Sequence, residues 1–67
     1  MNAKIALHVI SLVNNSKRQL ESRALARNLS RQYHTSIYRI YGIFGYLTKT
    51  NKISWAVRVK GGKSYII

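Results

Sequence analysis

The sequence predicts a small α+β domain that is mostly α with a small β-hairpin. Three observations support this fold class. Three segments are rich in helix formers or carry apolar residues at helical spacing, a Gly-Gly pair separates two alternating β-rich runs, and no proline interrupts the chain. A chain of 67 residues forms one domain. We therefore expect residues 1–67 to fold as a single unit.

The first helix is expected over residues 3–13. Both the length of this apolar segment and a stripe at helical spacing favour a helix over a long strand. Asn2 can cap its start, and Asn14 with Asn15 supplies a stop signal. The stripe consists of Ala6, Val9, Ile10 and Val13.

The second helix is expected over residues 23–29, although two capping signals compete before it. Ser16 with Gln19 forms a possible capping box, and Ser22 precedes the helix-forming run RALARNL. We prefer Ser22 as the cap, with Leu20 in a short extended link. The helix would bury Leu25, Ala26 and Leu29, and would align Arg23, Arg27 and Arg31 along one side.

The third helix is expected over residues 35–48, after a polar connection, with His34 or Thr35 at its start. Its apolar stripe is Ile37, Ile40, Tyr41, Phe44 and Leu47. Ser36, Arg39 and Ile43 fall away from that stripe.

A β-hairpin is expected over residues 54–67, with Gly61 and Gly62 as a two-residue turn. This turn pairs Val59 with Ser64, Arg58 with Tyr65, and Val57 with Ile66. The apolar face of the hairpin would cover the helices and carry Trp55, Val57, Val59 and Ile66. The opposite face would be free to meet a partner and carry Arg58, Lys60, Lys63 and Tyr65.

Charge is the strongest compositional feature, because 12 Lys and Arg face a single acid, Glu21, for a net charge of +11. A compact chain of this charge repels itself, and a polyanion such as DNA or RNA relieves that repulsion. We expect the helices and hairpin to gather this charge on one side. With one carboxylate side chain, no cysteine and no glycine-rich loop before a helix, the chain predicts no enzyme, no metal site and no cofactor. Residues 5–13 are too short to cross a bilayer, so we expect a cytoplasmic, nucleoid-associated protein without membrane contact.

The order of these elements resembles the winged helix-turn-helix family. The resemblance covers the whole chain and depends on SRALARNL over 22–29, TSIYR over 35–39, the apolar stripe that follows, and KGGK over 60–63. One departure is the link from Leu29 to Ile37, which is a residue longer than usual and lacks the glycine often found at the turn.

This resemblance implies DNA binding, with the third helix in the major groove and the hairpin wing on the flanking backbone or minor groove. Arg39 would bond a guanine in two places, for about 1–3 kcal/mol of discrimination. The candidates at base edges are His34, Thr35, Ser36, Tyr38 and Arg39, with Ile43 further along. The candidates for phosphates are Arg23, Arg27, Arg31, Arg58, Lys60 and Lys63, while Tyr65 could stack on unpaired bases.

Two glycines inside the third helix, Gly42 and Gly45, each cost about 1 kcal/mol relative to alanine. We interpret Gly45 as a site of close packing and Gly42 as a point of close approach to DNA, although small residues at this spacing also fit a homodimer contact.

The function expected first is that of a small transcriptional regulator of a prokaryote, an archaeon or one of their viruses. A low-specificity nucleoid protein that coats duplex DNA is an alternative, and so is an RNA-binding protein of ribosomal type.

Overall fold

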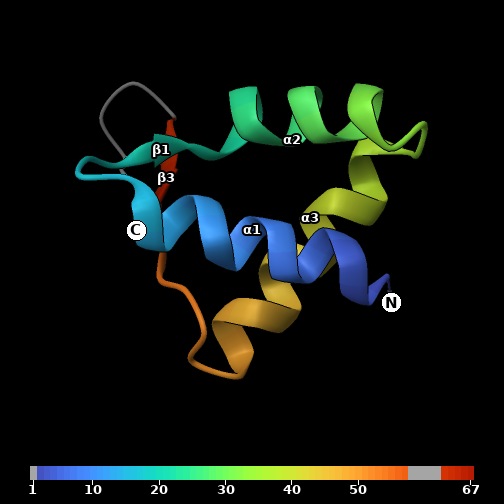
Figure 1. The fold of residues 1–67 in the computed structure, drawn as a ribbon. Coiled ribbons are helices and arrows are strands. Elements are labelled where there is room, and N and C mark those ends of the chain that lie inside the picture. Colours follow the sequence, from blue (N-terminus) through green and yellow to red (C-terminus); the bar gives the residue numbers. More distant parts are fainter. Residues whose placement is uncertain (1, 58–62) are drawn as a thin grey trace.

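The computed structural model describes residues 2–57 and 63–67. Within them the chain folds into three helices and a three-stranded antiparallel sheet (Figure 1). The elements are α1 (Ala3–Asn15), β1 (Leu20–Glu21), α2 (Ser22–Gln32), α3 (Ile37–Lys49), β2 (Trp55–Val57) and β3 (Ser64–Ile66). In Figure 1, α2 runs above α1, α3 crosses behind α1, and the sheet lies at one end of the helices. The predicted class, mostly helical with a hairpin in the manner of a winged helix, is confirmed.

The sheet differs from the predicted hairpin in its register and in having a third strand. Val57 pairs with Ser64, whereas the predicted turn pairs it with Ile66. Because this shift is two residues and side chains alternate with a period of two, the predicted division into two faces is kept. Trp55 and Ile66 are paired, as the inner face requires. The predicted Gly61–Gly62 turn and its Val59 pair lie outside the described residues.

The third strand, β1, forms where an unpaired link was expected. Leu20 is extended, as predicted, but it also pairs with Ile66 in β3. Strand β3 therefore lies in the middle, in the order β1-β3-β2. The last strand in the sequence thus bonds directly to the segment before α2.

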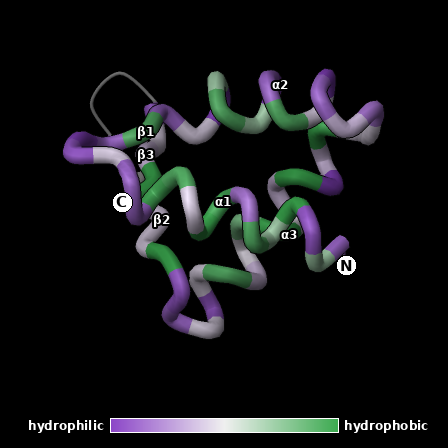
Figure 2. The backbone as a smooth tube through the Cα atoms, in the orientation of Figure 1, coloured by the Kyte–Doolittle hydropathy of each residue, from purple (hydrophilic) through white to green (hydrophobic). Residues whose placement is uncertain are grey.

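The core lies between the three helices and the inner face of the sheet. Figure 2 shows hydropathy alternating along each helix, with hydrophilic residues at the turns on either side of α3. The predicted stripe of α3 is confirmed, since Ile40, Phe44 and Leu47 are buried. Ile43 was expected to fall away from that stripe, but only 2% of it is exposed. The expectation was wrong because the buried arc of α3 is wider than the stripe, so that Ile43 belongs to the core.

Ser22 is not the cap of the second helix. The cap position is Glu21, and Ser22 is the first residue of α2. Its buried hydroxyl donates to the backbone oxygen of Ser64, at 3.1 Å, and also contacts the Ser64 hydroxyl. The side chain therefore ties the start of α2 to β3.

Helices α2 and α3 end in the same way, although no glycine follows either of them. His34 and Asn51 have left-handed backbones, with φ of 51° and 61°. The amide of Thr35 donates to Ser30 O at 3.0 Å, and that of Lys52 donates to Leu47 O at 2.8 Å. This is the bonding of a Schellman motif, in which glycine is the usual left-handed residue. His34 therefore takes the place of the missing turn glycine.

Helix α3 begins two residues later than predicted. His34 and Thr35 lie in the turn that follows α2, and Ser36 caps α3 by accepting a hydrogen bond from the Tyr38 amide at 3.1 Å. The turn between the two helices is thus bounded by a left-handed residue and a capping serine.

Neither glycine of α3 is required by packing. No atom lies within 4 Å of the position that a Cβ would take at Gly42 or at Gly45. The close-packing interpretation of Gly45 is therefore wrong. In the part of the chain that the structure describes, no helix has the length and apolar character needed to cross a membrane.

Candidate nucleic-acid interface

The side of α3 that faces away from the core forms one continuous exposed surface, here called the outer face. A glycine lies near its centre, with a tyrosine and a cation on either side. Tyr38 is 81% exposed and Tyr46 is 50% exposed. The members of the outer face are Tyr38, Arg39, Gly42, Tyr46 and Lys49, all of them exposed.

The dimensions of the outer face match a DNA groove. Arg39 and Lys49 are ten residues apart, which is about 15 Å along a helix. The major groove of B-DNA is about 12 Å wide and admits a helix. The outer face can therefore lie along one groove, with its two cations about three helical turns apart.

An open hollow of about 390 Å³ lies on the outer face, lined by Arg39, Gly42, Ile43 and Tyr46. Gly42 contributes only backbone to this lining. Arg39 and Tyr46 are exposed and border the hollow, whereas Ile43 is almost fully buried and adds little surface to it. Ile43 is therefore not an exposed contact residue, as the sequence predicted, but part of the wall of a hollow.

The start of α3 presents most of the predicted base-contacting residues. His34, Ser36, Tyr38 and Arg39 are exposed, whereas Thr35 is half-buried. Ser36 accepts a hydrogen bond from the Tyr38 amide as the helix cap, and this bond leaves its own hydroxyl proton free to be donated. Ser36 can therefore cap α3 and contact a base or phosphate together.

The arginines of α2 are exposed, as the sequence predicts. Arg23, Arg27 and Arg31 all lie on the solvent side of this helix. The Arg31 guanidinium also donates to Asn28 Oδ1 at 3.1 Å, which restricts its orientation. Because α2 leads into α3 through a short turn, Arg31 lies near the start of α3, whereas Arg23 lies at the other end of α2, next to β1 (Figure 1).

The wing is only partly described. Lys63 is exposed, while Arg58 and Lys60 lie outside the described residues. Tyr65 is half-buried in the central strand, opposite Ala56 and Glu21. The predicted pairing of Tyr65 with Arg58 is wrong, because the register is shifted. Tyr65 therefore has the only acidic residue of the chain as a cross-strand neighbour, a poor setting for stacking on nucleic acid.

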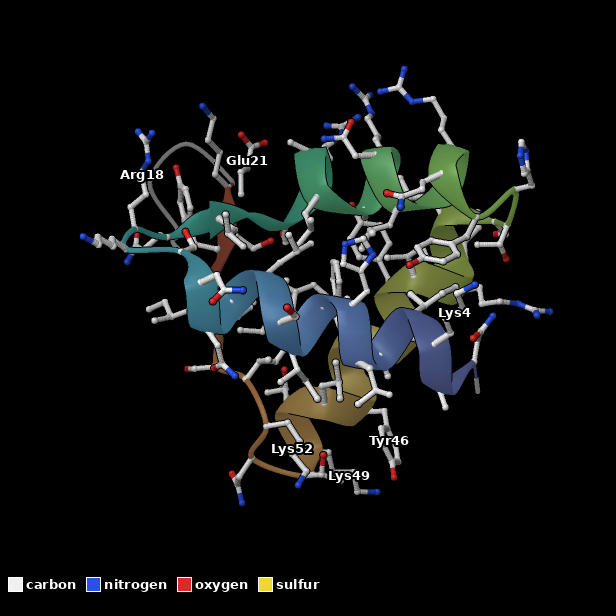
Figure 3. All side chains as sticks on the ribbon, in the orientation of Figure 1. Lys4, Arg18, Glu21, Tyr46, Lys49 and Lys52 are labelled. Atoms are coloured by element: carbon white, nitrogen blue, oxygen red, sulfur yellow. The ribbon has the colours of Figure 1, made fainter. Side chains whose placement is uncertain are left out.

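Basic side chains also lie away from the outer face. In Figure 3, Arg18 lies near the sheet, Lys4 near the start of α1, and Lys52 below the end of α3. The expectation that charge gathers on one side is therefore wrong for these residues. Three of the exposed residues near the end of α3 were missed by sequence reasoning: Tyr46, Lys49 and Lys52. Extending the helical period onward from Arg39 would have found the first two.

In the described ranges 2–57 and 63–67, no three His, Cys, Asp or Glu side chains are grouped so that they could hold a metal ion. The candidate interface is thus made of arginine, lysine, tyrosine and hydroxyl groups on two consecutive helices. Comparison of the chain with models of protein families, with curated proteins and with solved structures finds no match.

Proposed function

We propose that this protein binds duplex DNA, with the outer face of α3 in the major groove and the arginines of α2 on the adjacent phosphates. The observation that carries the proposal is the outer face itself. It has no acid, a cation towards each end, and a length that suits the groove. Helices placed in this way bind DNA in helix-turn-helix proteins, with the first residues of the second helix at base edges.

The chemistry of α3 supports a preference for particular sequences. Arg39 can donate two hydrogen bonds to guanine O6 and N7, and the hydroxyls of Ser36 and Tyr38 can bond base edges or phosphates. We therefore propose a small regulator of transcription. DNA is favoured over double-stranded RNA because the major groove of an RNA helix is too deep and narrow for side chains to reach its bases.

A second candidate is a low-specificity protein that coats duplex DNA in a nucleoid. The observation that favours it is the presence of exposed cations, such as Arg18 and Lys52, away from the outer face. Such cations contact phosphates without regard to sequence. The two candidates differ in whether α3 discriminates between base pairs.

Binding selection from random duplex DNA, repeated at two salt concentrations, separates the candidates. A recovered motif supports the regulator, and uniform recovery with a steep salt dependence supports the coating protein. Selective binding of structured RNA, with no duplex DNA recovered, would contradict both.

A matched pair of variants then tests the role of α3. Arg39→Ala should relax the recovered motif at one position, because it removes a contact to a base. Arg18→Ala removes the same charge from the link before β1. It should weaken binding to all DNA sequences equally and leave the recovered motif unchanged. If both variants keep the parent's motif, Arg39 does not contact a base.

A further inference from the structure

The hollow on the outer face lies at Gly42, a glycine that packing does not require. Gly42 and Gly45 are alike in that a methyl group added to either would have no atom within 4 Å. They differ in place, since Gly42 lines the hollow and Gly45 does not. A glycine weakens a helix interior, so its presence on an exposed surface points to something that approaches the backbone there.

The residues that line the hollow indicate which kind of chemical group it could bind. Tyr46 offers a ring and the stem of Arg39 is also apolar, while Ile43, of which only 2% is exposed, adds little surface. The charged end of Arg39 is the cation of this lining. The hollow therefore suits a small apolar group that lies next to a hydrogen-bond acceptor.

The major groove of DNA offers one kind of apolar group, the 5-methyl of thymine, while guanine presents the acceptors O6 and N7. We propose that the hollow at Gly42 receives a thymine methyl while Arg39 bonds a neighbouring guanine. This inference rests on the proposed function and adds the identity of one base contact. The backbone at Gly42 would be the point of α3 that comes closest to the base edges.

Replacement of thymine by uracil tests the contact, because it removes the methyl and keeps every hydrogen-bonding group of the base. In a duplex that the parent binds, each thymine is replaced in turn and the dissociation constant is measured. At one position the affinity of the parent should fall about fourfold, the effect of about 0.8 kcal/mol for one buried methyl-sized group.

Two alanine variants show whether the hollow is responsible. Gly42→Ala adds a methyl group to the lining of the hollow, at the place proposed for the thymine methyl, so it should bind the thymine duplex more weakly and lower the thymine-to-uracil ratio towards one. Gly45→Ala makes the same chemical change in the same helix, outside the hollow, and should keep the ratio of the parent. Circular dichroism of both variants confirms that α3 is intact.

The outcomes separate this inference from the proposed function. Equal affinity of the parent for thymine and uracil at every position overturns the methyl contact and leaves DNA binding in place. A Gly42→Ala variant that keeps the ratio of the parent also overturns it. If the parent binds no duplex at all, the proposed function and the inference fall together.

Discussion

Replacing Gly45 by alanine should raise the free energy of unfolding by about 1 kcal/mol, the difference in helix propensity between the two residues. The structure indicates that this propensity difference applies in full at Gly45. Gly45 lies inside α3, and its added methyl would meet no atom within 4 Å. The gain arises mainly in the unfolded chain, where alanine has fewer conformations to lose than glycine.

The expected shift is large enough to measure. In a domain of this size, 1 kcal/mol moves the midpoint of thermal unfolding by about 4–8 °C. Melting followed by far-ultraviolet circular dichroism, with a urea titration alongside, gives both quantities. The double variant Gly42→Ala with Gly45→Ala should gain about twice as much, apart from a small coupling between neighbouring positions.

Ala24 supplies the reverse change, because it is an exposed residue in the first turn of α2. Ala24→Gly should lower the midpoint, by less than a glycine in the helix interior would. If Ala24→Gly is destabilising as expected but Gly45→Ala leaves stability unchanged or lowers it, the space beside Gly45 is not open and the reasoning is refuted.

Four further predictions concern the turns, the α2–β3 contact, Trp55 and salt. His34→Gly should raise the free energy of unfolding by about 1 kcal/mol and Asn51→Gly by less, since asparagine tolerates a left-handed backbone better; the opposite order in urea unfolding would contradict this. Ser22→Ala should cost about 1–3 kcal/mol, and in a double-mutant cycle with Ser64→Ala the two losses should not add. Trp55→Phe should lower the free energy of unfolding far less than Trp55→Ala in the same assay. The buried Nε1 of Trp55 has no hydrogen-bond partner among the described residues, while its ring stacks on Tyr41. Equal losses would mean that the indole nitrogen, and not the ring, stabilises the fold. DNA affinity, followed by fluorescence anisotropy, should fall roughly as the sixth power of salt concentration if about six to eight cations meet phosphates, and a flat salt dependence would exclude phosphate contacts as the source of binding.

Local sequence patterns were sufficient to predict that the three helices exist, although not all of their ends. The cap at Asn2 and the stripe of Ile40, Phe44 and Leu47 follow from residues within one or two turns of each other, and both are confirmed. Ile43 was misplaced because a stripe at ideal spacing is narrower than the arc that a helix buries when it packs against several elements at once. Its burial depends on those neighbours, which the pattern of α3 alone does not contain.

Contacts between distant segments could not be predicted in this way. Ser22 has the residue type of a cap, and only the position of Ser64 in the fold decides that its hydroxyl is used elsewhere. The pairing of Leu20 with Ile66 is of the same kind. The hairpin register was wrong by two residues, and because this is an even number Trp55 and Ile66 still share a face, as predicted.

The outer face likewise has features that the local sequence predicts and features that it does not. Tyr38 and Arg39 were predicted from the start of α3, and both are exposed. The left-handed backbone of His34 was not predicted, because the turn lacks the glycine that usually signals it. The hollow at Gly42 could not be predicted either, since it depends on how Ile43 and Tyr46 border an unoccupied position on the helix.

The central place of β3 has a consequence for how the chain acquires its structure during synthesis. Helices α1, α2 and α3 can each begin to form as they leave the ribosome, because their bonds are local. The sheet cannot form at that stage, because Leu20 in β1 pairs with Ile66 in β3, which is synthesised later. Until then the apolar residues that Ile66 covers stay open to water or to chaperones. We therefore expect this domain to fold more slowly than a helical bundle of its length, with closure of the last strand as the late step.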